Sequence, residues 1–193
     1  MMNSVKRIKF LTVGALFATL MVIGSYIRFP LPLLTMTMQT FFVLLSGFLL
    51  GGKGAFFSMF LYLCMGLLGL PVFSEGGGIG YVLKPSFGFI IGFCIGAFVT
   101  GFLAKKSSKS FIHLFLCGCV GLAVIYTVGL LHYTIISCTV LDVPVSIRSL
   151  FMFCFLLPLP GDIISCFLAT TLAKRLSPIF REFEFFHENK KFF

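Results

Sequence analysis

Few side chains in this sequence could do chemistry, and Asp162 is the most prominent of them. It follows Pro160 and Gly161 in LPLPGD and opens an apolar run, which is the position of a first-turn helix residue. A carboxylate inside a membrane segment is costly and usually marks a functional site, although the N–H groups at a helix start reduce the cost. Asp162 is therefore either a helix cap or an acceptor for N–H donors on the polar ring of a bound solute.

The stretch 69–85, GLPVFSEGGGIGYVLKP, is polar and rich in glycine and lies between two long apolar runs. Gly76, Gly77, Gly78 and Gly80 can adopt positive φ and can bring bare backbone N–H and C=O groups close to a ligand. The stretch predicts a binding loop. The alternative is an ordinary flexible turn between two spans.

Four further residues could complete a binding site. Lys84, at the end of the glycine loop, could pair with a carboxylate on the solute or could extend to the membrane interface as an anchor. Tyr81 together with Phe73 offers a flat apolar wall with a hydroxyl. Gln39 is an amide among apolar neighbours, and it could bind the solute or form a hydrogen bond between helices.

Other patterns that suggest chemistry fail on inspection. The stretch 47–54, GFLLGGKG, lacks the Ser or Thr with which a P-loop holds magnesium, and the GGGIG run has no βαβ unit around it. The three histidines show no metal spacing, the seven cysteines contain no CxxC pair, and no nucleophile motif such as GxSxG is present. We therefore expect no enzyme activity, no metal and no cofactor.

Composition places the chain among integral membrane proteins. Of its 193 residues 59% are hydrophobic and 11% are charged, and the mean hydropathy is +1.09. This length has room for roughly five to seven spans of about 20 residues and for no sizeable soluble domain, so residues 1–193 are expected to form one membrane domain in contact with lipid. The net charge of +9 is spread between apolar runs and not over one face, which disfavours nucleic acid as a partner.

The apolar runs predict an all-α protein with six transmembrane helices. The runs are 10–27, 35–51, 55–70, 86–104, 111–140 and 161–176. The glycine loop lies between the third and fourth helices, and a GGKG turn joins the second to the third. The segment 145–157 is too short to cross the membrane, and it predicts a short interfacial or re-entrant segment before the sixth helix. One long kinked helix over 145–176 is the alternative.

The positions of the basic residues predict the orientation. With a cytoplasmic N-terminus, Arg28, Lys84 and Arg148 are the three among fifteen lysines and arginines that fall outside. This predicts a multi-pass protein of the cell inner membrane, with residues 1–9 and the tail 177–193 both in the cytoplasm. The glycine loop and Asp162 then face the outside together.

Small residues mark one strip of the first helix. Gly14, Ala15 and Ala18 would let another helix approach closely. The strip could pack the first helix inside the bundle, or it could receive a helix of a partner subunit.

The sequence resembles the BioY family, the biotin-specific S-components of energy-coupling factor (ECF) transporters. The resemblance rests on motifs spread over most of the chain: PLP at 30–32, TMQTFFVLLSGFLLG at 37–51, GLPVF at 69–73, GYVLKPSFGFIIGF at 80–93, YTVGL at 126–130 and LPLPGDIISCFLATTLAKRL at 157–176. It implies a six-helix subunit that captures biotin from outside. The partner would be an energising module of two ATPase subunits and a transmembrane coupling subunit.

The resemblance also assigns residue roles, with one departure. It places the family's acid, the contact for the ureido ring of biotin, on Asp162. The family's lysine for the biotin carboxylate would fall on Ser165, and the family usually has glycine where Lys84 stands. Our hypothesis is that Lys84 supplies the displaced charge; Arg28, hydroxyls such as that of Ser165, or a different substrate are the alternatives. A solitary or secondary transporter of biotin or of another small carboxylated solute is the alternative function.

Overall fold

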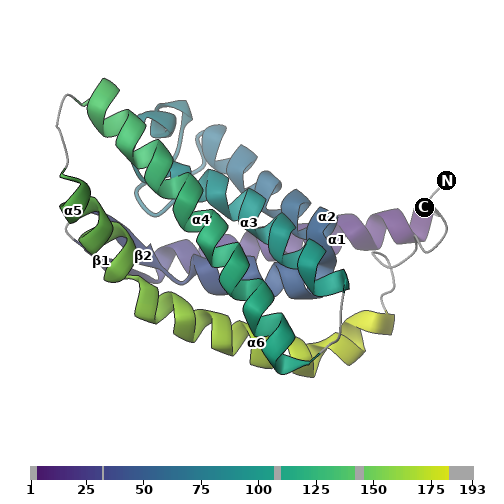
Figure 1. The fold of residues 1–193 in the computed structure, drawn as a ribbon. Helices are drawn as coiled ribbons and strands as arrows, with labels where there is room; N and C mark the ends of the chain where they lie inside the picture. The colour runs from purple at the N-terminus through teal and green to yellow at the C-terminus, as the bar shows by residue number, and fades with distance from the viewer. Residues whose placement is uncertain (1–3, 32, 107–109, 142–145, 183–193) are drawn as a thin grey trace.

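The computed structural model describes residues 4–31, 33–106, 110–141 and 146–182, and these form a helical bundle (Figure 1). Five segments are long and apolar enough to cross a membrane: 8–26 in α1 (Ser4–Tyr26), α2 (Gln39–Leu67), 87–105 in α3 (Phe87–Lys106), α4 (Phe111–Thr139), and 148–178, which ends within α6 (Leu159–Glu182). The predicted all-helical membrane architecture therefore agrees with the described part of the chain, apart from the short strands below.

The second helix, α2, is broken at Gly51. This residue has φ 71° and ψ 173°, a conformation that is essentially restricted to glycine. The Gln39 amide nevertheless donates a hydrogen bond to the Tyr62 hydroxyl at 2.8 Å. In a straight helix these residues would lie about 35 Å apart, so the halves 39–50 and 52–67 fold back on each other. The structure therefore has a break at the single residue Gly51 where the sequence predicted a GGKG turn between two helices.

Helix α3 packs between α2 and α4, and glycine permits the close approach on both sides. A Cβ on Gly52 would stand 2.8 Å from the Phe98 carbonyl oxygen, and a Cβ on Gly92 would stand 2.9 Å from that of Ile125. Small residues let helix backbones approach closely where lipid gives no hydrophobic drive for association. The three helices form the rigid centre of the bundle.

Helix α1 packs its small residues inward. Gly14 and Ala18 are buried, and a Cβ on Gly14 would meet the Phe57 ring of α2 at 2.9 Å. Ala15, the third residue of the predicted strip, is exposed.

Two short strands lie at one end of the bundle, and an all-α prediction does not include them. Strand β1 (Arg28–Pro30) pairs antiparallel with β2 (Thr35–Thr37), with Phe29 opposite Met36. Helix α1 ends at Tyr26 and Pro30 closes β1, in keeping with the preference of a residue before proline for extended backbone. The same preference for extended backbone allows the segment to form a hairpin before α2 begins at Gln39.

The glycine loop folds down onto the helix ends. Its residues form a bridge between Phe73 and Gly76 and a 3₁₀ helix, η1 (Ile79–Leu83). The Phe73 ring is buried between Tyr62 and Tyr81, and the Gly78 N–H donates to the Gly66 carbonyl at 2.7 Å. The loop is therefore anchored to α2 by an aromatic side chain and by its own backbone.

The last third of the chain follows the alternative of one kinked helix. Helix α5 (Ile147–Phe151) leads into a π-helical turn, η2 (Met152–Leu156), and α6 begins three residues later. The Leu157 N–H donates to the Met152 carbonyl and the Asp162 N–H to the Pro158 carbonyl, so helical bonds continue through the bend seen in Figure 1. Pro160 does not break α6, because residues in the first helical turn need no N–H donor.

The two ends of the bundle carry different elements (Figure 1). The start of α1, the break in α2 and the end of α6 lie at one end, whereas the β1–β2 hairpin, the glycine loop and α5 lie at the other. Segments far apart in the sequence therefore meet where the loop and hairpin cover the helices.

Candidate functional site

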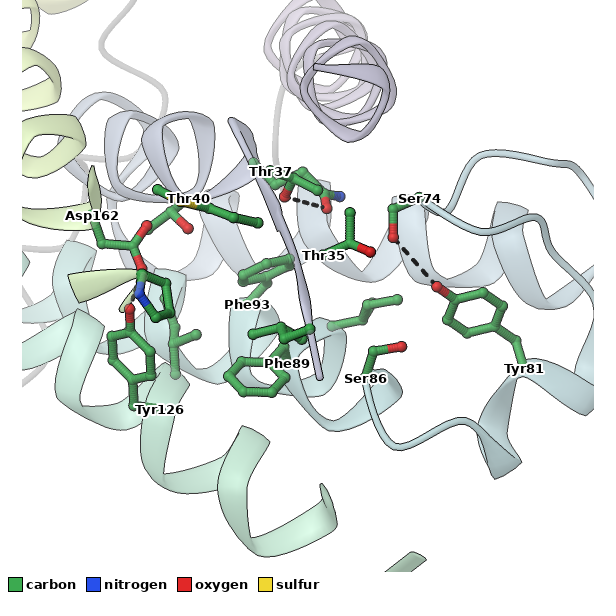
Figure 2. A pocket seen from close by; sticks show the side chains of 16 residues that line it. Thr35, Thr37, Thr40, Ser74, Tyr81, Ser86, Phe89, Phe93, Tyr126 and Asp162 are labelled. Carbon is green, nitrogen blue, oxygen red and sulfur yellow. Dashed lines mark hydrogen bonds between the residues drawn. The ribbon is translucent and has the colours of Figure 1, made fainter. Parts of the chain in front are cut away.

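A pocket lies at the end of the bundle that carries the hairpin and the glycine loop (Figure 2). It is lined by residues of the hairpin, the glycine loop and the helices α2, α3, α4 and α6, and part of it is open to solvent. Its apolar lining consists of Leu34, Met36, Phe89, Ile90, Phe93, Ile125 and Pro158. Its polar lining consists of Thr35, Thr37, Gln39, Thr40, Ser74, Tyr81, Ser86, Tyr126 and Asp162.

The first end of the pocket is acidic. Asp162, in the first turn of α6, is 7% exposed, and the Tyr126 hydroxyl of α4 donates a short hydrogen bond to its Oδ2. Thr40 of α2 also lines the pocket near this carboxylate (Figure 2). Three helices thus meet around one acid at the pocket wall. Among the residues that the structure describes, Asp162 is the only one lining the pocket with a formal charge.

Gln39 is held in one orientation and is linked through Tyr62 to the glycine loop. Its Oε1 accepts a hydrogen bond from the Thr37 hydroxyl at 2.9 Å, and its Nε2 donates to the Tyr62 hydroxyl at 2.8 Å. Tyr62 in turn donates to the Val72 carbonyl at 3.0 Å. An amide nitrogen carries two donor hydrogens, so one remains for a ligand in the pocket.

The opposite end of the pocket carries hydroxyl groups. Ser74 and Tyr81 come from the glycine loop and lie 3.5 Å apart between their oxygens, and Ser86 precedes α3. Figure 2 shows these side chains on the far side of Phe89 and Phe93 from Asp162. The site is therefore polar at both ends and aromatic between them.

The two predicted cations, Lys84 and Arg28, are not among the residues that line the pocket. The Lys84 ammonium is 3.1 Å from Glu75 Oε2 and 4.8 Å from the centre of the Tyr81 ring. The Arg28 guanidinium donates to the Ser74 carbonyl. Each cation therefore contacts one of the two glycine-loop residues, Tyr81 and Ser74, that line the pocket.

Three other residues expected at the site are also outside its lining. Phe73 is buried beneath Tyr81, with the two ring centres 4.7 Å apart. Gly78 bonds through its N–H to α2, as described above. Ser165 is buried on α6, one turn after Asp162. The structure thus brings together Asp162, Gln39 and Tyr81 of the predicted set.

Sequence reasoning missed several lining residues, and the partners of Asp162 matter most. Tyr126 stands 36 residues before the acid, on another helix, and Thr40 stands on a third. A signal for Tyr126 was present, because it is one of a few polar side chains inside an apolar helix of 29 residues. Nothing in the sequence alone indicated which acid it would meet.

Comparisons with known proteins agree on one family. The model described as the BioY family matches residues 1–182. A protein of Lysinibacillus sphaericus named "Probable biotin transporter BioY" is 38% identical over 168 residues, which cover 86% of each chain. "Biotin transporter BioY" of Thermotoga maritima is 39% identical over 117 residues, covering 60% of this chain and 69% of its own.

A solved structure matches nearly the whole fold. The crystal structure of an S-component for biotin from an ECF-type ABC transporter superposes with a TM-score of 0.80 at 26% sequence identity. The match covers 96% of this chain and 99% of that one.

Proposed function

This chain belongs to the BioY family, and from that premise we propose that it takes up biotin as the substrate-binding subunit of an ECF-type transporter. It is a multi-pass membrane protein and not an enzyme. The observation that carries the proposal is the single carboxylate, Asp162, that lines an otherwise uncharged pocket between aromatic side chains.

The chemistry of biotin matches the order of groups along the pocket. The ureido ring presents two N–H donors and a carbonyl, the bicycle is apolar, and the tail ends in a carboxylate. Asp162 would accept from one ureido N–H group while Tyr126 holds its other oxygen. Phe89 and Phe93 would cover the bicycle, which leaves the tail directed toward Ser74 and Tyr81.

The finer topology is part of the same proposal. The two halves of α2 are counted as separate spans, and the bent α5–α6 segment as the last, which gives six spans with both termini in the cytoplasm of the inner membrane. The distribution of basic residues supports this orientation, because Lys53 follows the break in α2 at Gly51, and that break lies at the end of the bundle away from the hairpin and the glycine loop. The pocket would then open to the outside.

An energising module is the proposed partner. Gly14 and Ala18 pack against α2, so the face of α1 that remains for a partner helix is the exposed one, which carries Ala15 and Leu16. A solitary carrier is the alternative. Uptake of labelled biotin into cells with and without co-expressed ATPase and coupling subunits separates the two, since a solitary carrier transports in both.

Isothermal titration of the purified chain with biotin tests the binding proposal. We expect submicromolar binding for the unaltered protein and a loss of at least about tenfold for Asp162→Asn, which replaces one acceptor oxygen by a donor. Thr171→Val is the matched control on α6, because its hydroxyl bonds to the Phe167 carbonyl of the same helix. Unchanged affinity in Asp162→Asn would remove the assigned role of the acid, and absence of binding in the unaltered chain would remove the proposal.

A further inference from the structure

We infer that the pocket binds biotin derivatives with an uncharged tail, such as the primary amide, about as well as it binds biotin itself. The inference rests on the proposed function and concerns the end of the ligand opposite the ureido ring. It defines the substrate class as a ureido bicycle with a short polar tail, whether or not that tail is ionised.

The first argument is the charge of the lining. Among the described residues that line the pocket none is a lysine or arginine, and the one charged side chain, Asp162, is negative. A carboxylate brought into this space finds no opposite charge in contact with it. It also shares a low-dielectric pocket with another anion, where repulsion is stronger than in water.

The second argument is the chemistry of the tail end. Ser74, Tyr81 and Ser86 present hydroxyl groups, and a hydroxyl can both donate and accept. Such groups can donate to a carboxylate oxygen or to an amide carbonyl, and they can accept from an amide N–H. A site made of hydroxyls therefore distinguishes weakly between an acid and its amide.

The third argument is that both nearby cations already have partners. Glu75 Oε2 lies 3.1 Å from the Lys84 ammonium, whose other hydrogen bond goes to the Glu75 carbonyl at 3.2 Å. The Arg28 guanidinium is bound to the Ser74 carbonyl. Binding of the ligand carboxylate by Lys84 would require this ion pair with Glu75 to open.

If a cation bound the tail, the affinities for biotin and for its amide would differ greatly. If a lysine or arginine held the tail, the amide would lose a charge-assisted hydrogen bond and bind at least about tenfold more weakly. With hydroxyls alone we expect the two dissociation constants to agree within about threefold.

Titration of the purified chain with three ligands at neutral pH tests the inference. The ligands are biotin, its primary amide, and biotin methylated on both ureido nitrogens. We expect the first two to bind alike and the third to bind far more weakly, because it lacks a donor for Asp162. Tight binding of biotin with amide binding weakened tenfold or more would overturn the inference alone. Failure of all three to bind would overturn the proposed function and the inference with it.

Variants of the two cations provide the second measurement. Lys84→Ala and Arg28→Ala should leave the ratio of the two dissociation constants, amide to acid, unchanged. If either variant weakens biotin tenfold while leaving the amide unchanged, that residue is the counter-ion and the inference is wrong. Because the ratio is taken within one protein sample, a partial loss of folded protein does not affect it.

Discussion

At the scale of single residues, the pocket depends on how Asp162 is held. A carboxylate with two oxygens can serve a ligand and a protein donor together, and here the Tyr126 hydroxyl occupies Oδ2. Tyr126 is therefore a positioning residue for the acid as well as part of the wall.

Tyr126→Phe removes the donor and keeps the ring. We expect biotin affinity to fall about tenfold, because the net contribution of a hydrogen bond to a charged group is about 1.5–3 kcal/mol. Titration with biotin measures the change. Tyr133→Phe is the matched control, since Tyr133 is buried on the same helix and does not line the pocket. An equal loss in both variants would mean that the effect is structural.

The sequence indicated the acid but not its setting. Asp162 stands out because an ionisable residue in an apolar run is rare. Tyr126 and Thr40 join it through tertiary contacts between separate helices, which no local pattern encodes. Lys84 was a reasonable candidate by type and place, but the fold of the glycine loop brings Glu75, nine residues earlier, to its ammonium group.

At the scale of elements, the aromatic contact of Phe73 with α2 helps to position the glycine loop. The Phe73 ring lies over Gly66, where any side chain would collide with it. The Tyr81 ring contacts the Phe73 ring and also lines the pocket. The position of Phe73 on α2 therefore determines where the hydroxyl-bearing end of the pocket lies.

Gly66→Ala should displace Phe73 and with it the loop. We expect a loss of about 1–3 kcal/mol in the free energy of unfolding, the usual cost of overpacking, together with weaker biotin binding. Thermal unfolding in detergent and titration measure the two effects. Gly80→Ala is the control, since a Cβ there meets nothing within 4 Å and its φ is not positive. If the free energy of unfolding of Gly66→Ala equals that of the unaltered protein, the contact of Phe73 with Gly66 does not position the loop.

The positions of the helices were predicted better than their boundaries and connections. Apolar runs located the helices, because lipid requires long apolar segments. The sequence did not predict the β1–β2 hairpin, because a segment with two prolines usually indicates a turn. Strand pairing also depends on a partner segment, which a local pattern does not identify. The break expected at Pro158 and Pro160 became a bend, because a π-helical turn and the first turn of α6 absorb the missing donors.

At the scale of the whole molecule, the open question of topology is whether α2 crosses the membrane twice. Its halves fold back at Gly51, so counting it as two spans puts residue 106 on the N-terminal side of the membrane. Counting it as one span puts residue 106 on the opposite side. The predicted membership of the BioY family is confirmed by the family match over residues 1–182, but that match does not decide the count.

Alkaline phosphatase fusions decide it, because the enzyme is active only outside the cytoplasm. We expect a fusion after Lys106 to be inactive and a fusion after Leu141 to be active. A fluorescent protein at the C-terminus, which folds in the cytoplasm, should fluoresce, and it would stay dark if α2 crossed the membrane once. The reverse pattern of phosphatase activity would show that α2 crosses once.

The break in α2 also bears on the lipid around the protein. Its halves are about 18 Å and about 24 Å long, against about 30 Å for the hydrocarbon core. Lys53, exposed beside the break, needs water or headgroups at that depth. The bilayer should therefore be pinched along this side of the bundle, and hydrophobic mismatch should grow with acyl chain length. The protein should keep its biotin binding in vesicles of short-chain lipids at temperatures where it loses binding in vesicles of long-chain lipids. Membrane thickness would then affect the rate of biotin uptake.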